Sequence, residues 1–212
     1  RKDGLDDSGE FSLVDVSQEW GFDHRIYGMG IVPIDANRDG VRDYFITSIA
    51  EALLMTGPPE NGFQEIAGEA GLQGGFTGLT YTATWSPIAL DMDGDDLEDL
   101  YVRAGQIAAP AFITNEQNQR DFAWLIDSSG QAVEGEFVLL SESGEAGRGA
   151  VTADFDGDGA LDILAGSASD GPIRLYMATG GGNEIHVRFE PSVSAPGAPG
   201  ALLTATCEGS VR

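Results

Sequence analysis

Three short windows of the chain combine carboxylate side chains at one spacing. They are Asp35–Asp43 (DANRDGVRD), Asp91–Asp99 (DMDGDDLED) and Asp154–Asp162 (DFDGDGALD), and each reads D-x-[DN]-x-D-[GD]-x-x-D. Oxygen ligands at positions 1, 3 and 5, a tight turn at position 6 and a further carboxylate at position 9 suit calcium, a hard cation that takes about six to eight oxygens. Magnesium fits this ligand set less well, because it prefers a tight octahedron.

The windows hold 13 of the 35 acidic residues, so their side chains repel one another unless a cation neutralises them. An EF-hand is excluded, because that loop needs a glutamate at position 12, where this chain has Ile46, Val102 and Ala165. A single acidic turn is often only a solvated loop with side chain–backbone hydrogen bonds. Three copies with one spacing instead indicate a metal-binding repeat.

The composition of the whole chain limits its fold and its partners. Its 212 residues are enough for one good-sized domain or two small ones, and 30 glycines favour an all-β fold with frequent turns. The formal net charge of -24 opposes binding to nucleic acid or to an anionic membrane surface. No apolar run is long enough for membrane insertion, and the single cysteine, Cys207, is expected to be a small buried residue.

The segments around each window repeat as well. A short apolar strand is expected before each window, at Gly30–Ile34, Ser86–Leu90 and Gly149–Ala153, and a second strand directly after its ninth position. Third strands are expected at Ala52–Met55, Ala111–Thr114 and Ile173–Tyr176, and fourth strands near Phe63, Phe122 and Ile185. Four strands per repeat is the number in a β-propeller blade.

Two glycine-rich segments, Gly71–Thr84 and Ser128–Arg148, are expected to connect the blades. They are either flexible connectors or a binding rim, and the sequence leaves both readings open. The three tryptophans, Trp20, Trp85 and Trp124, are expected to pack blades rather than to form a carbohydrate platform.

On these loops and strands, the chain resembles the FG-GAP/VCBS repeat family of β-propellers, whose blades carry calcium loops between their first two strands, as in the integrin α-chain. Phe63–Leu72, echoed by Leu13–Phe22, is similar to the blade-ending segment of the bacterial and cartilage-acidic-protein-like branch. Ile185–Phe189 with Gly200–Thr206 resembles the start of the ASPIC/UnbV module that follows the propeller in that branch.

The resemblance implies a ligand set for each window. Side-chain ligands would stand at positions 1, 3, 5 and 9, with the last bidentate, and position 7 would donate a backbone carbonyl. The fifteen residues are Asp35, Asn37, Asp39, Val41 and Asp43; Asp91, Asp93, Asp95, Leu97 and Asp99; and Asp154, Asp156, Asp158, Ala160 and Asp162. Of these three calcium sites the first should be weakest, because Asn37 replaces a carboxylate and Arg38 and Arg42 add positive charge. In the second, Asp96 stands in place of the turn glycine, and aspartate tolerates the left-handed conformation.

The resemblance also implies a domain organisation. Residues 1–190 would form a partial propeller that opens on the last strand of an earlier blade at Leu13–Val16, and residues 191–212 would begin the ASPIC/UnbV-like module. The blades would span about 24–72, 80–128 and 145–190. Three blades do not close a ring, because closed propellers have about four to eight. We therefore expect either the C-terminal part of a larger, seven-bladed propeller or a partner chain that supplies the missing blades.

Two classes of function remain. The first is a calcium-rigidified module for protein–protein interaction or adhesion, located extracellularly, at the cell surface or in the periplasm, with a protein as partner and a carbohydrate as the second candidate. The second is a propeller-type enzyme similar to sugar-processing lyases, with most catalytic residues outside this chain. We favour the first, non-enzymatic class, because His24 and His186 lie far apart in the repeat plan and no nucleophile motif is present.

Overall fold

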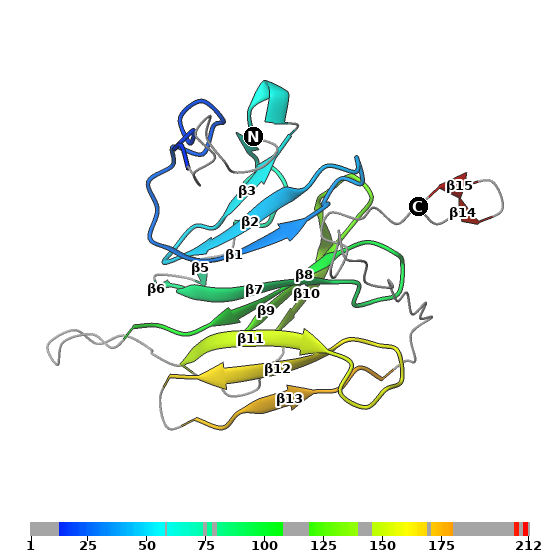
Figure 1. The fold of residues 1–212 in the computed structure, drawn as a ribbon. Helices are drawn as coiled ribbons and strands as arrows, with labels where there is room; N and C mark the ends of the chain where they lie inside the picture. Colours follow the sequence, from blue (N-terminus) through cyan, green and yellow to red (C-terminus); the bar gives the residue numbers. More distant parts are fainter. Residues whose placement is uncertain are drawn as a thin grey trace, which may run out of the picture. The chain divides into compact units, whose positions relative to one another are not determined.

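The computed structural model describes residues 13–57, 59–73, 76–77, 80–107, 119–139, 146–168, 171–179, 206–207 and 210–211. Within these ranges the chain forms β-strands and one short 3-10 turn, η1 (Pro59–Asn61), and no α-helix. The expected all-β class is confirmed (Figure 1). Among the described residues, no helix has the length and apolar character needed to span a membrane.

Three antiparallel sheets in the described residues follow the chain strand by strand. The first sheet contains β1 (Gly28–Ile34), β2 (Asp43–Ser48), β3 (Leu53–Thr56) and β4 (Gln64–Glu65). The second contains β7 (Thr84–Leu90), β8 (Asp99–Ala104), β9 (Phe122–Ile126) and β10 (Ala132–Leu139). The third contains β11 (Gly147–Ala153), β12 (Asp162–Ser167) and β13 (Arg174–Tyr176). These sheets form no closed ring among the described residues, so the propeller itself stays a prediction.

Two hairpins complete the described strands. They are β5 (Phe76–Thr77) with β6 (Thr80–Tyr81), and β14 (Thr206–Cys207) with β15 (Ser210–Val211). The chain divides into two compact units, Arg1–Gly182 and Asn183–Arg212. The three larger sheets belong to the first unit, and the β14–β15 hairpin belongs to the second.

The strand register places each acidic window at the same corner of its sheet. The residue pairs that close the windows are Ile34 with Asp43, Leu90 with Asp99 and Ala153 with Asp162. Each window is therefore the connection between the first and second strands of its sheet, as the sequence predicts. We call the windows the first (35–43), second (91–99) and third (154–162) acidic loops.

Parts of the predicted strand plan are wrong. The strand that begins at Phe122, β9, is third in its sheet rather than fourth. The fourth strand, β10, lies inside the segment Ser128–Arg148 that was expected to be a connector. Its sequence, AVEGEFVL, contains glycine and two glutamates, which are depleted in strands, so its pattern is weak. The strands expected at Ala111–Thr114 and near Ile185 lie outside the described residues.

The N-terminal segment also differs from its prediction. Leu13–Val16 forms no strand, because no described strand pairs with it, and the side chains of Leu13 and Val14 are exposed. The echo between Leu13–Phe22 and Phe63–Leu72 is nevertheless structural, because both segments form one kind of turn. Its backbone hydrogen bonds run from Trp20 to Val16 and Phe22 to Ser17, and from Ala70 to Ile66 and Leu72 to Ala67.

The three sheets stack through two apolar layers. The larger layer lies between the first and second sheets, where Trp124 packs against Phe45 and is stacked on Phe122 at 5.6 Å between ring centres. The smaller layer, between the second and third sheets, contains Ile88, Leu90, Tyr101, Ile163 and Ala165. The second sheet is therefore covered on both faces.

A buried ion pair reinforces the smaller layer. The side chains of Arg103 in β8 and Asp121 are at most 1% exposed and pair with each other. The Tyr101 hydroxyl donates to the same carboxylate at 2.7 Å. Arg103 also donates to the Gly166 carbonyl at 3.2 Å and to the Ser167 hydroxyl at 3.1 Å, both in β12. This network ties the second sheet to the third.

Candidate metal centres

The last aspartate of each acidic loop is the first residue of a buried strand. Asp43, Asp99 and Asp162 begin β2, β8 and β12, and each residue is at most 1% exposed. One carboxylate oxygen of each accepts the backbone N–H of loop position 2, at 2.8–3.1 Å. This hydrogen bond closes the loop by joining its second position to the buried carboxylate of its ninth position.

The second carboxylate oxygen of the ninth aspartate, Oδ1, has a hydrogen-bond partner in the second and third loops but not in the first, among the described residues. Asp99 Oδ1 accepts the Ile126 N–H at 2.9 Å, and Asp162 Oδ1 accepts the Ala178 N–H at 2.8 Å. Gly57 occupies the matching place in the first sheet, and its N–H acts to lower the pKa of Asp43. That contact falls outside hydrogen-bond geometry, and among the described residues Asp43 Oδ1 is buried without a partner.

Positions 1, 3 and 5 fold each loop through hydrogen bonds to its own backbone. In all three loops the position 3 side chain accepts the N–H of position 5, and the position 5 side chain accepts the N–H of position 7. Position 1 accepts the N–H of position 6. Such Asx turns form without a metal, so the loop conformation alone does not show a metal site.

The backbone is left-handed at positions 4 and 6 of every loop. At position 6, Asp96 has a φ of 68°, which confirms the expected substitution for glycine. The left-handed conformation at position 4 was not predicted, although glycine stands at that position in the second and third loops. Gly94 and Gly157 meet it at low cost, whereas Arg38 adopts a φ of 57° in the first loop and carries the strain.

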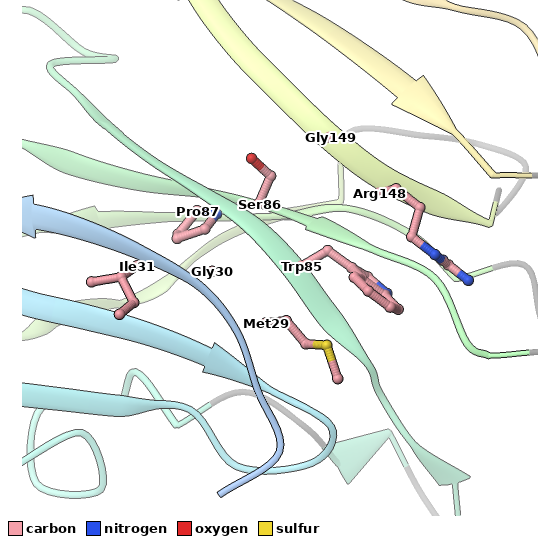
Figure 2. A pocket seen from close by; sticks show the side chains of 8 residues that line it. All are labelled: Met29, Gly30, Ile31, Trp85, Ser86, Pro87, Arg148 and Gly149. Carbon is pink, nitrogen blue, oxygen red and sulfur yellow. The ribbon is translucent and has the colours of Figure 1, made fainter.

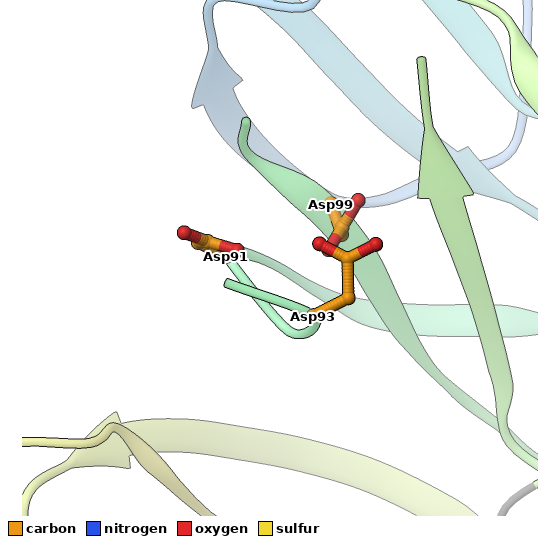
Figure 3. Close-up of side chains that lie close together, drawn as sticks. All are labelled: Asp91, Asp93 and Asp99. Atoms are coloured by element: carbon orange, nitrogen blue, oxygen red, sulfur yellow. The ribbon is translucent and has the colours of Figure 1, made fainter. Parts of the chain in front are cut away.

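The second and third loops each gather three carboxylates around one point. Oxygens of Asp91, Asp93 and Asp99 lie within 4.8 Å of one another (Figure 3). The third loop does the same with Asp154, Asp156 and Asp162. Two oxygens bound to one calcium are separated by at most about 5 Å, since each lies about 2.3–2.6 Å from the ion. One cation can therefore contact all three carboxylates of a loop, while the position 5 carboxylates lie outside these groups.

In the first and second loops, burial and repulsion make the ninth carboxylate costly to ionise without a cation. Burial raises the pKa of Asp99 to about 6, and the charges of Asp93 and Asp95 add to the rise. Burial likewise raises the pKa of Asp43 to about 6. Position 1 of the third loop behaves differently: burial acts to raise the pKa of Asp154, but backbone N–H groups of the loop outweigh it and lower the pKa.

The first loop balances its charges with side chains of the protein. The Asn37 amide donates to Asp39 at 3.1 Å, and Arg42 pairs with Glu98 of the second loop at 2.7 Å. The Asp35 N–H donates to the same glutamate at 2.9 Å. Glu98 therefore joins two loops, a role that the sequence analysis missed. No carboxylate triad is found at this loop among the described residues.

The remaining candidate side chains fall into different places. His24 is exposed, and Trp124 is buried in the larger layer as expected. Trp20 lies in a turn and is 38% exposed, and Trp85 lines a pocket, so blade packing does not describe all three tryptophans. His186 lies outside the described residues. No protein-family model and no curated protein matches the chain.

Proposed function

We propose that the chain is a calcium-stabilised β-propeller-type module for protein–protein interaction or adhesion. The observation that carries the proposal is the pair of carboxylate triads, which two loops of different sheets build at the same register position. The repeated antiparallel meander, stacked sheet on sheet, supports the propeller part of the proposal.

The donor set favours calcium. Each triad offers only carboxylate oxygens, which hard cations prefer, and no sulfur or imidazole ligand. Asp91, Asp93 and Asp99 would hold one ion, and Asp154, Asp156 and Asp162 another. A bound cation would neutralise the triad and pin the end of the first strand to the start of the second. A calcium-stabilised module needs a compartment where calcium is plentiful, so our proposal places the protein outside the cytoplasm.

The third sheet supports a protein partner. Val151, Leu164 and Leu175 stand side by side in register across β11, β12 and β13, and Val151 and Leu175 are 57% and 49% exposed. The equivalent row of the first sheet contains Phe45 and Leu54, which the second sheet buries completely. A further sheet, from a longer chain or a companion chain, would cover the row on the third sheet in the same way.

Thermal unfolding in calcium and in excess chelator tests the proposal. A ligand that binds only the folded chain stabilises it by RT ln(1 + [L]/Kd), so calcium should raise the melting temperature, and magnesium at the same concentration should raise it less. An identical melt in calcium and chelator, with metal removal verified by elemental analysis, would overturn the proposal.

A further inference from the structure

A pocket of 270 Å³ lies where the first strands of the three sheets begin (Figure 2). Each strand contributes the residues that stand six and five positions before the first aspartate of its loop. They are Met29 and Gly30 in β1, Trp85 and Ser86 in β7, and Arg148 and Gly149 in β11. The repeat therefore brings equivalent positions of three sheets together at the end of the strands opposite the acidic loops.

The backbone is adapted to this convergence. Each first strand has an irregular register at this place, between Gly28 and Ile31, Thr84 and Pro87, and Gly147 and Ala150. Such bulges take side chains out of regular alternation and commonly lie beside binding sites. The position after each large side chain is a small residue. A Cβ atom at Gly30 would lie 2.3 Å from the Trp85 carbonyl oxygen, so β1 approaches β7 this closely only with glycine.

The three large side chains bring a positive charge, an aromatic ring and a thioether to the pocket. The Arg148 guanidinium lies 4.0 Å from the centre of the Trp85 ring, and Met29 adds a thioether. Arg148 donates to the Gly105 and Gly147 carbonyls at 3.0 and 2.6 Å and to the Gln106 carbonyl at 3.2 Å. An arginine has five N–H donors, so two remain for a ligand beyond these three described contacts.

The positive charge of Arg148 has no described carboxylate beside it. Its hydrogen-bond acceptors in the described part of the chain are all neutral carbonyls, although the chain has 35 acidic and 11 basic residues. Burial lowers the pKa of Arg148, and no acid among the described residues counters that effect. Asp154, the nearest loop carboxylate along β11, is six residues away, which is about 20 Å of strand. At physiological ionic strength charges are screened over about 8 Å, so that carboxylate does not neutralise Arg148.

We propose that this pocket binds a small organic carboxylate whose body is a single ring with an apolar face. Arg148 donates its two remaining N–H groups to the carboxylate, and Trp85 and Met29 contact the body of the ligand. The volume lies just below the range of about 300–1,000 Å³ that is typical of ligand pockets, so the ligand is a single ring rather than a chain of rings. The site is independent of the calcium loops.

The test is a titration of the calcium-saturated chain, followed by the NMR signal of the Trp85 indole N–H, which donates to the Gly105 carbonyl beside Arg148. A Trp85→Phe variant assigns the signal. Glucuronate and benzoate are the probes, with glucose and benzamide as uncharged controls. We expect at least one acid to shift the signal saturably at millimolar concentration and to bind at least tenfold more tightly than its control. The acid that does so shows whether the body is a sugar or an aromatic ring.

Two variants locate the binding. Arg148→Gln should weaken the acid at least tenfold while leaving the calcium-dependent rise in melting temperature unchanged. Ile31→Trp, at a pocket-lining residue that is 65% exposed, should block the pocket without touching Arg148, and so tests the site even if Arg148→Gln folds poorly. The proposal is overturned if neither acid shifts the signal, if the uncharged controls bind equally well, or if binding survives Ile31→Trp.

Discussion

The first acidic loop and the second fold their backbones alike but treat their carboxylates differently. Both are closed by a buried aspartate at position 9, and both are left-handed at positions 4 and 6. In the second loop, Asp91 and Asp93 converge with Asp99. In the first loop, the amide of Asn37 occupies a carboxylate oxygen of Asp39.

This difference separates loop conformation from metal binding. The turns depend on side chain–backbone hydrogen bonds, which an asparagine accepts as well as an aspartate does. The need for a cation depends instead on how many carboxylates converge and how deeply they are buried. The second and third loops therefore carry the calcium proposal most strongly. Among the described residues, the Oδ1 atoms of Asp35 and Asp43 are buried without a hydrogen-bond partner, and these two atoms are what the first loop offers a cation.

The largest effect should come from removing the ninth aspartate. Asp99→Ala and Asp162→Ala each leave two backbone N–H groups without an acceptor, and hydrogen bonds to charged groups contribute about 1.5–3 kcal/mol each. We expect each to lower the free energy of unfolding in calcium by about 3 kcal/mol or more, and Asp43→Ala to cost less, because that carboxylate accepts one hydrogen bond. Urea unfolding measures the order, and a larger loss for Asp43→Ala would reverse the comparison of the loops.

Substitutions at position 3 test metal binding without changing a buried carboxylate. Asp93→Asn and Asp156→Asn should each weaken one calcium site by about tenfold, which is about 1.4 kcal/mol, while Asn37→Asp should strengthen the first site. Calcium-dependent melting of each variant gives the comparison. Glu69→Gln is the control, because it also removes one negative charge but at an exposed position outside the loops. It should not change the calcium-dependent melting. Equal effects of Glu69→Gln and Asp93→Asn would show that only net charge matters.

The pH dependence should change sign with calcium. Because burial raises the folded-state pKa of Asp43 and Asp99 to about 6, their contribution to stability is complete below about pH 4 and is lost as the pH rises through about 6. The metal-free chain should therefore lose stability between about pH 4 and pH 7. With calcium the trend should reverse, since the ion binds the deprotonated carboxylates.

Melting curves across this pH range, with and without chelator, measure the effect. Asp99→Asn removes one titrating group, so the stability of the metal-free chain should depend less on pH in this variant. If the stability of the metal-free chain instead rises over the whole pH range, the folded state does not raise the pKa of these carboxylates as we describe.

The smallest effect concerns the contact between the first two loops. Arg42 and Glu98 are 57% and 36% exposed, and surface ion pairs contribute about 0–1 kcal/mol. Arg42→Gln should therefore change stability by less than about 1 kcal/mol and should slightly raise calcium affinity at the first loop. Calorimetric titration measures both, with the exposed Arg25→Gln as control. A large loss of stability would mean that Arg42, rather than a cation, organises the first loop.

The sequence predicts the loops and their flanking strands well, because both signals are local. Apolar strands on either side of an acidic turn identify β1, β2, β7 and β8 without reference to the rest of the chain. β10 was missed because its pairing with β9, rather than its composition, makes it a strand. Arg103 was missed for a related reason: its burial depends on Asp121 and on the third sheet, which lie far away in sequence.

The candidate site divides in the same way. The spacing predicts ligands at positions 1, 3, 5 and 9, and the triads of two loops bring positions 1, 3 and 9 together. Glu98 could not be predicted, because its contacts to Asp35 and Arg42 depend on how two sheets stack. The pocket beside Trp85 and Arg148 likewise needs three sheets in place before its residues meet.

Calorimetric titration of the metal-free chain with calcium tests the central claim most directly. We predict two saturable sites of similar affinity and a weaker third, with one of the tighter sites weakened about tenfold in Asp93→Asn and the other in Asp156→Asn. Either no saturable binding, or binding that is unchanged when both substitutions are combined, would contradict the assignment of calcium to these loops.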